Sequence, residues 1–438
     1  MIRKAEHRNP WYFVPTLAFT LGITLIIVNQ VASMMYASLG VSTQLIGVLT
    51  ILGLPIAFNV FFAPFVDSYS TKRNWILGTQ AALVVCLLFL AVCLLIDFHV
   101  VAVSIVLVGL LALAAGVYAI PNGGFFVEAL TKKEQGFFVG INTAFIRIAI
   151  IFTTGVLVII SGKFGEKVNN IHYGWSLFFF MCAFAVLITS VWHLFIMPYP
   201  KTPLRKEKQG YLAPFKEFFT QQGALLFVSY ILVFRLGEGL LTIMSSPFFL
   251  NSAEQGGLGM TVAEVGFAKG TVGVAASIIG GVLAGVFLKG KHYRKMIIIF
   301  AICMTAPNAL YIYLARFQPQ EMAEINLSFI PALFGSAAQW TAMVNIKTLA
   351  AIAIETFGYG LGYTAFVFVV YRIAEASSFR ATTISIAMAL QNVGWTFSGF
   401  VSGFIQSAVG YEILFTLSIL LSIPGIILLV LLLRKREI

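Results

Sequence analysis

Apolar segments long enough to cross a lipid bilayer recur along this chain of 438 residues. Hydrophobic residues make up 59% of the sequence and charged residues only 10%, whereas charged residues make up about 25% of a soluble domain. A bilayer core of roughly 30 Å requires about 20 apolar residues for each helix. The pattern therefore predicts an all-α membrane protein with twelve transmembrane helices. The expected spans are residues 11–37, 44–66, 75–96, 99–120, 137–161, 173–197, 221–249, 261–288, 295–315, 347–371, 380–407 and 411–433.

Basic residues gather at one end of these predicted helices. Most of the 28 Lys and Arg precede the first helix, occupy the even-numbered connections or follow the last helix. Because Lys and Arg are enriched in cytoplasmic loops, we expect both termini in the cytoplasm. The net charge of +11 is explained by this topology and by contact with anionic lipids. It predicts no nucleic-acid partner.

The longest strongly polar connection follows the sixth predicted helix, at residues 197–219. It divides the chain into an N-terminal bundle at residues 1–200, a cytoplasmic linker at 201–220 and a C-terminal bundle at 221–438. Two six-helix bundles joined by a central cytoplasmic loop are typical of the major facilitator fold. In such transporters the substrate site lies near the membrane midplane, between the two halves.

The connection between the ninth and tenth helices, at residues 316–345, is unusually long. Its start is polar and Pro331 interrupts its apolar part, so the sequence does not predict a transmembrane helix here. We expect an insertion on the outer face of the membrane. Its apolar part, residues 327–344, is expected to form an interfacial helix or a partly re-entrant segment.

A possible gate lies between the second and third helices. The sequence APFVDSYSTKRNW at residues 63–75 resembles a loosened form of the facilitator loop motif, in which an acidic residue is followed by a basic cluster. Asp67 is expected to pair with Arg73 or another basic group and to latch the helices in one alternating-access state. The alternative is an ordinary solvated loop.

Four further stretches occur in one order along nearly the whole chain. The sequence resembles the AmpG-type muropeptide permeases, a major facilitator branch that also contains the acetyl-CoA transporters. The resemblance implies proton-driven import of anhydromuropeptides through the bacterial inner membrane. The stretches are LPIAFNVFFAPFVDSY with NWILGTQ (54–80), VEALTKKEQG with FIRIAI (127–150), FRLGEGLLT with AEVGFAKGTVG (234–273), and IETFGYGLGYTAFV with SSFRATTISIAMALQNVG (354–394).

The fourth predicted helix departs from this family. Where family members carry acidic residues, this chain has AIPNGGFF at residues 119–126 and retains only Glu128. Glu128 is therefore a candidate for the proton site. Import of a siderophore or another oligosaccharide is the alternative to import of a muropeptide.

Two opposite charges lie midway along the seventh predicted helix, in the sequence VFRLGEGL. Each charge costs about 3 kcal/mol or more to insert at the bilayer centre, so an intramembrane charge indicates function. Arg235 and Glu238 are three residues apart and are expected on one helical face. We expect them to neutralise one another while facing a hydrated cavity that binds substrate through Arg235. The alternative is a purely structural ion pair.

Glu355 on the tenth predicted helix is the favoured proton carrier. It lies nine residues after Lys347, which places it about 13 Å into the membrane at 1.5 Å per residue. A poorly hydrated carboxyl group that faces each side of the membrane in turn is what proton coupling requires. Glu238 is the competing carrier.

Two further cations are candidate substrate ligands. Arg147 has no acidic residue within one helical turn, so its fork-shaped guanidinium group suits an anionic substrate group. The alternative is a structural contact with Glu128 or with backbone carbonyls. Lys269 is expected either to contact substrate or to extend to the membrane surface.

Uncharged polar residues complete the expected site. We expect Arg147, Arg235, Glu238 and Glu355 to converge on one hydrated chamber between the two halves. Asn29, Asn142 and Gln391 are expected to bind sugar hydroxyl groups there, and Trp395 to stack on a sugar face. For each of these four residues, ordinary interhelical packing is the alternative.

The sequence predicts a transporter rather than an enzyme. It contains no Walker loop, HExxH, GxSxG or Cys/His metal motif, and its five His are expected at or outside the membrane boundaries. We expect a monomeric, multi-pass inner-membrane symporter of a small solute and protons, without cofactor or metal. A membrane-embedded transferase and a sensor that binds solute without moving it are the competing classes.

Overall fold

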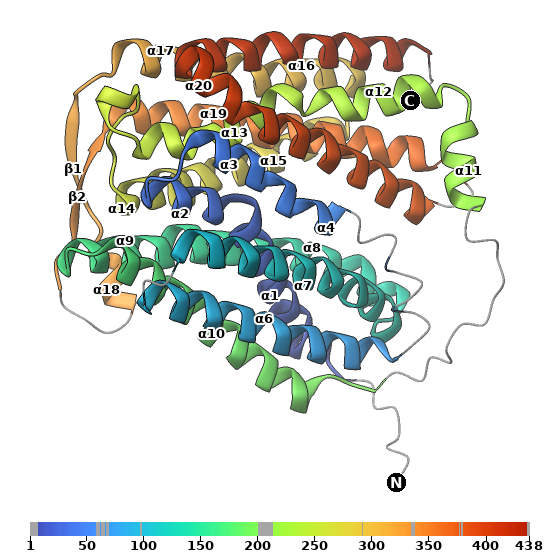
Figure 1. Ribbon diagram of the computed structural model, residues 1–438. Coiled ribbons are helices and arrows are strands. Elements are labelled where there is room, and N and C mark those ends of the chain that lie inside the picture. The colour runs from blue at the N-terminus through green and yellow to red at the C-terminus, as the bar shows by residue number, and fades with distance from the viewer. Residues whose placement is uncertain are drawn as a thin grey trace. The chain divides into compact units, whose positions relative to one another are not determined.

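A computed structural model describes residues 8–57, 62, 66, 70–96, 99–199, 213–290, 292–333, 338–375, 377 and 380–435. This described part is largely helical (Figure 1) and contains ten helices long and apolar enough to cross a membrane, besides the shorter apolar helix Thr43–Ile56. The longest, Thr383–Arg434, holds two of the predicted spans, since Gly410 interrupts it with φ 78° and ψ 176°. The prediction of an all-α, multi-pass membrane protein is confirmed.

The chain folds as two compact units. The first unit comprises Met1–Met35 and Leu52–Lys208, and the second comprises Tyr36–Ile51 and Gln209–Ile438. Residues 36–51, which the sequence places in the first six helices, thus pack within the second unit.

Helices that pack side by side form the first unit. Helix α6 packs against α7 and α10, and α1 packs against α8. A capping box of Thr131 and Glu134 begins α8, and the Asn170 side chain caps α10. The elements are η1 (Pro10–Tyr12), α1 (Val14–Ile26), η2 (Ile27–Val31), α2 (Ala32–Ser38, shared with the second unit), η3 (Thr50–Gly53, also shared), α4 (Leu54–Ala57), α6 (Lys72–Ile96), α7 (Val100–Ala129), α8 (Lys132–Ile151), η4 (Phe152–Leu157), α9 (Val158–Lys167) and α10 (Ile171–Ile196).

The second unit contains the rest of the helices and a small sheet. Its elements are α3 (Thr43–Leu49), α11 (Ala213–Thr220), α12 (Ala224–Phe234), α13 (Leu236–Leu250), η5 (Ala253–Gln255), α14 (Val262–Val265), η6 (Gly266–Gly273), α15 (Val274–Leu288), α16 (Tyr293–Thr305), η7 (Ala306–Asn308), α17 (Ala309–Phe317), β1 (Met322–Asn326), α18 (Phe329–Leu333), β2 (Thr341–Asn345), α19 (Ile346–Glu375) and α20 (Arg380–Lys435).

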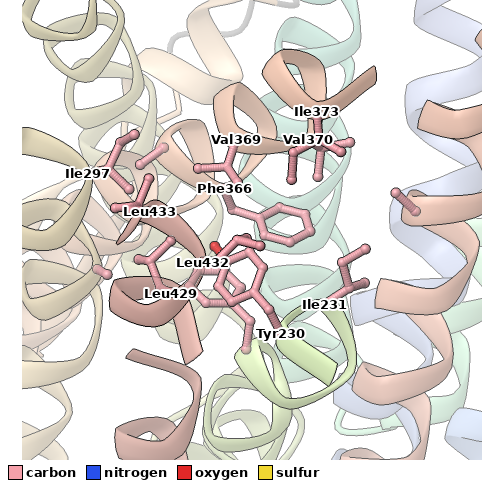
Figure 2. Packing of buried hydrophobic residues seen from close by; sticks show 14 of the residues in the cluster. Tyr230, Ile231, Ile297, Phe366, Val369, Val370, Ile373, Leu429, Leu432 and Leu433 are labelled. Atoms are coloured by element: carbon pink, nitrogen blue, oxygen red, sulfur yellow. The ribbon is translucent and has the colours of Figure 1, made fainter. Parts of the chain in front are cut away.

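An apolar core joins α12, α16, α19 and α20 in this unit. Figure 2 shows Tyr230, Phe366 and Leu429 among its members, which come from three of these helices. The Phe234 ring stacks on Phe366 with 4.9 Å between ring centroids. This packing fixes the end of α12 against the middle of α19.

Segment α3 lies against α20 through close glycine contacts. Gly47 approaches the backbone of Gly399 and Gly403. Thr43 Oγ1 donates to Gln406 Oε1 at 2.5 Å. Small residues at a helix interface let two backbones approach in this way.

The 316–345 connection differs from both structures expected for it. Strands β1 and β2 pair antiparallel, with Glu324 opposite Met343 and Ile325 opposite Ala342. The cause is a period-2 alternation in MAEIN and TAMVN, which suits one covered face and one exposed face of a strand. A salt bridge joins the two ends of the hairpin: Lys347 Nζ, at the start of α19, lies 2.5 Å from Glu321 Oε1, just before β1.

Helices α15 and α19 approach closely through a reciprocal pair of glycines. A Cβ on Gly280 would meet the Phe357 carbonyl, and one on Gly360 would meet the Ser277 carbonyl. Because α19 carries Glu355, this contact also sets the position of that carboxyl group.

Replacing one of these glycines is expected to destabilise the protein. Gly360→Ala forces the α15 and α19 backbones apart and should lower the free energy of unfolding by about 1 to 3 kcal/mol, as overpacking does. Gly285→Ala is the matched control, because nothing lies within 4 Å of a Cβ there. The measurement is thermal unfolding in detergent, and equal unfolding temperatures for the two variants would contradict the close contact.

Candidate functional site

The seventh predicted transmembrane span is broken at Arg235. Helix α12 ends at Phe234, α13 begins at Leu236, and Arg235 between them has φ −97° and ψ −2°. Glycines follow at positions 237 and 239, where α20 packs too closely for larger side chains. The Ser398 hydroxyl donates to the Leu236 carbonyl at this point. A break of this kind frees backbone polar groups inside a membrane protein, which is tolerated where other groups satisfy them.

The Arg235 side chain is buried against aromatic rings. It is 6% exposed, and its guanidinium carbon lies 5.4 Å from the ring centroids of Tyr359 and of Tyr363. Its Nε and Nη1 atoms have no hydrogen-bond partner in the described part of the chain. The expected close pair with Glu238 is not formed, because Arg235 lies at the helix break and its side chain extends to α19. The two charges interact only at longer range.

Glu238 lies in the first turn of α13 and is 3% exposed. The Thr242 hydroxyl, one turn later on the same helical face, donates to Glu238 Oε1 at 3.0 Å. The negative charge therefore lies near the positive end of the α13 dipole.

Lys269 lies in η6, a π-helical segment of sequence GFAKGTVG, and is 8% exposed. Its Nζ donates to Ser245 Oγ at 2.7 Å and to Ser246 Oγ at 3.0 Å, both on α13. The ammonium group thus points into the second unit rather than to the surface. Single π-helical turns within α-helices are frequent at functional sites.

Glu355 occupies the middle of α19 and is 5% exposed. The Tyr311 hydroxyl of α17 donates to Glu355 Oε2 at 3.3 Å. Tyr359 and Tyr363 follow at four-residue intervals, so a carboxyl group and two phenol rings share one face of α19. This face lies toward Arg235.

These groups form a cluster of four buried charges in the second unit. Glu355 interacts electrostatically with Glu238 and Lys269, and Glu238 interacts with Arg235 and Lys269. Within the described residues none of the four makes a salt bridge: tyrosine rings hold Arg235, and hydroxyl groups bind the other three. The cluster has balanced charge when both carboxyl groups are ionised. It can therefore accept a proton or an anion without a salt bridge having to break.

Two candidates on α20 belong to the same unit. Gln391 is buried, and Trp395 is half-buried with an indole N–H that has no hydrogen-bond partner in the described structure. The Trp395 carbonyl faces Gly239, so this turn of α20 packs on the first turn of α13.

The remaining substrate candidates belong to the first unit. Arg147 on α8 is half-buried and makes no hydrogen bond or salt bridge with any described residue. Asn142, on the same helix, and Asn29, in the π-helical segment η2, are also half-buried. The Glu128 carboxylate binds the Lys72 side chain and is not the partner of Arg147.

Of the two residues expected to form the gate, the structure describes only Arg73. Asp67 lies outside the described residues. Arg73 is buried at the end of α10, where its Nη2 donates to the Leu194 carbonyl at 2.7 Å and its Nε to the Met197 carbonyl at 3.3 Å. Its guanidinium carbon also lies 4.0 Å from the Tyr199 ring centroid.

One histidine is buried inside the first unit. His193 is fully buried, with Nε2 at 2.8 Å from Thr16 Oγ1 and Nδ1 at 2.9 Å from Gln80 Nε2. These contacts join α1, α6 and α10. No group of three or more His, Cys, Asp or Glu side chains in the described structure is arranged to hold a metal ion.

Sequence reasoning did not identify the neutral partners of the four charges. Tyr311, Ser245 and Ser246 carry no signal in the sequence that separates them from other hydroxyl residues. Tyr359 and Tyr363 had one, namely their four-residue spacing from Glu355.

Comparison with known proteins gives the family. The family model described as the Major Facilitator Superfamily matches residues 13–346. The anhydromuropeptide permease of Escherichia coli strain K12 is 23% identical over 425 residues, which cover 94% of this chain and 77% of the permease.

Solved structures agree in fold. A bacterial homologue of the human lysosomal transporter Spinster, in an inward-facing and occupied conformation, has a TM-score of 0.67 at 14% identity and covers 98% of each chain. A D-xylose-proton symporter has a TM-score of 0.66 at 12% identity, over 94% of this chain and 95% of the symporter. At these identities the likeness shows the fold alone. The chain belongs to the Major Facilitator Superfamily and is a membrane transporter rather than an enzyme.

Proposed function

We propose that the protein is a proton-coupled symporter that imports an anhydromuropeptide-like amino-sugar peptide across the inner membrane by alternating access. The observation that supports coupling is the cluster of Arg235, Glu238, Lys269 and Glu355, in which uncharged groups hold four buried charges. The anhydromuropeptide permease among its relatives supports the solute class.

The neutral partners matter because a transporter has to change its charge contacts in every cycle. Truncating one partner of a buried salt bridge costs about 3 to 5 kcal/mol, since it leaves the other charge uncompensated. A hydrogen bond from a hydroxyl group to a charged group contributes only about 1.5 to 3 kcal/mol. Charges held by hydroxyl groups can therefore exchange partners at lower cost than charges locked in ion pairs.

Glu355 is the proposed proton carrier. Among the described residues its hydrogen bond comes from the neutral Tyr311 hydroxyl, whereas Glu238 lies within electrostatic reach of Arg235. Glu238 is the second candidate. Glu128 is less suited, because Lys72 already compensates its charge.

Solute contacts are proposed in both units. Arg147 would bind an anionic group, since it is a half-buried cation without a partner among the described residues. Lys269 lies beside the carboxyl pair and links the solute site to the proton site. Asn29, Asn142, Gln391 and Trp395 would contact the sugar through hydrogen bonds and ring stacking.

The orientation of the protein in the membrane and the place of its gate are proposed from the distribution of charged residues in the sequence. Both termini are proposed to be cytoplasmic, because most Lys and Arg lie on that side. The segment containing Asp67 and Arg73 would form a cytoplasmic gate. The protein is proposed to act as a monomer in contact with membrane lipids.

Removing the proton carrier should uncouple transport. Glu355→Gln keeps the size and a hydrogen-bond acceptor for Tyr311 but cannot take up and release a proton. In proteoliposomes loaded with solute, exchange should persist, while accumulation driven by a pH gradient should fall at least about tenfold, which corresponds to 1.4 kcal/mol of lost coupling.

Glu412→Gln is the control for this experiment, because Glu412 is exposed on α20 and only weakly paired with Arg316 at 3.9 Å. Unchanged gradient-driven accumulation by Glu355→Gln would reject Glu355 as the carrier. The same loss in Glu238→Gln alone would transfer the role to Glu238.

Arg147→Gln tests the proposed anion contact in the first unit. Uptake of a carboxylate-bearing solute should weaken by about 10-fold or more, and uptake of its neutral amide much less, because a charge-assisted hydrogen bond is lost. Initial uptake rates over a concentration series measure both. Equal losses for the two solutes would return Arg147 to a structural role.

The solute itself is tested by competition. Proteoliposomes with a pH gradient are offered radiolabelled anhydromuropeptide together with unlabelled anhydromuropeptide, a siderophore or acetyl-CoA. Accumulation displaced only by anhydromuropeptide supports the proposal, and absence of its entry and competition contradicts it. Measurable binding without accumulation would instead indicate a sensor.

A further inference from the structure

Two arginines of this protein lie against tyrosine rings in buried positions, and they differ in one respect. Arg73 sits 4.0 Å from the Tyr199 ring centroid, and its N–H groups donate to the carbonyls that end α10. Arg235 has the same relative exposure of 6% and two flanking rings, yet its Nε and Nη1 atoms donate to no described residue. The Nε and Nη2 atoms of Arg73 thus have acceptors, whereas Nε and Nη1 of Arg235 have none among the described residues.

A buried guanidinium group in which two nitrogen atoms lack an acceptor is costly. Leaving a buried donor without a partner costs about 1 to 3 kcal/mol, and more for a charged group. Cation–π contacts with Tyr359 and Tyr363 and a hydrogen bond with Tyr359 offset part of this cost, but they leave Nε and Nη1 without an acceptor among the described residues. A group retained at such a cost in a transporter indicates an acceptor that arrives during the cycle.

The surroundings select the chemistry of that acceptor. Helix α13, fifteen residues long, begins directly after Arg235, and its N-terminal end favours an anion. Glu238 lies within electrostatic reach and disfavours a second negative charge on the ligand. A carboxylate, with one charge, therefore fits better than a phosphate, which carries about 1.5 to 2 negative charges near neutral pH.

We propose that Arg235, flanked by Tyr359 and Tyr363, is a receptor for a carboxylate group of the transported solute. This subsite rests on the proposed transport function and makes it more specific. The helix break at Arg235 lets its side chain extend to the face of α19 that carries both tyrosines. The tyrosine rings exclude water from the ion pair and strengthen it.

The test is a comparison of acid and amide ligands. Full-length protein in lipid nanodiscs is titrated calorimetrically with 1,6-anhydro-N-acetylmuramyl tripeptide and with the analogue in which every carboxyl group is an amide. Arg235→Gln should lower the affinity for the acid by about 10- to 100-fold and that for the amide by less than about threefold. The preference for acid over amide should therefore fall at least about tenfold.

Matched variants separate this role from a structural one. Arg316→Gln removes an exposed cation from the same unit and should leave both affinities unchanged. Arg235→Lys keeps the charge, so it should fold if Arg235→Gln does not and should retain part of the preference for the acid. Equal loss of both ligands in Arg235→Gln would overturn the proposal. A double variant, Arg235→Glu with Glu238→Arg, exchanges the two charges. If it kept the preference for the acid over the amide, the role of Arg235 would be an internal ion pair with Glu238, and the proposal would be overturned.

A second probe keeps the subsite testable if the muropeptide is the wrong solute. Binding of neither muropeptide form by the unmodified protein would reject that solute class. N-acetylglutamate and its diamide, at millimolar concentration, then replace the tripeptide in a thermal-unfolding assay. Stabilisation by the acid that Arg235→Gln abolishes supports the carboxylate subsite, and stabilisation that does not depend on Arg235 rejects it.

Discussion

A backbone that crosses a membrane has to satisfy its own hydrogen bonds, because lipid offers none. This constraint explains why the described chain is mainly helical, and it makes each departure from regular helix informative. Three such departures hold candidate residues: Asn29 in the π-helical segment Ile27–Val31, Arg235 at the break after α12, and Lys269 in the π-helical segment Gly266–Gly273. The irregular backbone brings polar side chains to positions that a continuous helix would not give them.

Charge burial follows the same logic at the level of side chains. Arg235, Glu238, Lys269 and Glu355 lie in one unit, close enough to influence one another but without a direct ion pair among the described residues. Serine, threonine and tyrosine hydroxyl groups and two phenol rings occupy the intervening positions. Charges arranged in this way can respond to an added proton or anion without a salt bridge having to break.

The sequence predicted the helices well, because a run of about 20 apolar residues has few alternatives in a membrane. It also singled out Arg235, Glu238, Lys269 and Glu355, since isolated charges stand out in apolar segments. The set expected to converge, however, contained Arg147 of the first unit and not Lys269. It did not predict the break at Arg235, so the expected pairing with Glu238 on one helical face was wrong. The β-hairpin of Met322–Asn326 and Thr341–Asn345 was missed because a short alternating pattern beside Pro331 resembled an interrupted helix. The burial of His193 depends on helices distant in sequence, which no local pattern reports.

The packing of α3 in the second unit has a consequence for how the chain is assembled. Residues 36–51 fill a surface of α20 lined by Gly399 and Gly403, and the Thr50 hydroxyl donates to the Thr396 carbonyl there. A fragment that starts after the central linker lacks residues 36–51 and leaves Gly399 and Gly403 of α20 without this contact. The second unit is therefore complete only when synthesis has already delivered part of the first half, so the two ends of the polypeptide are interdependent during insertion.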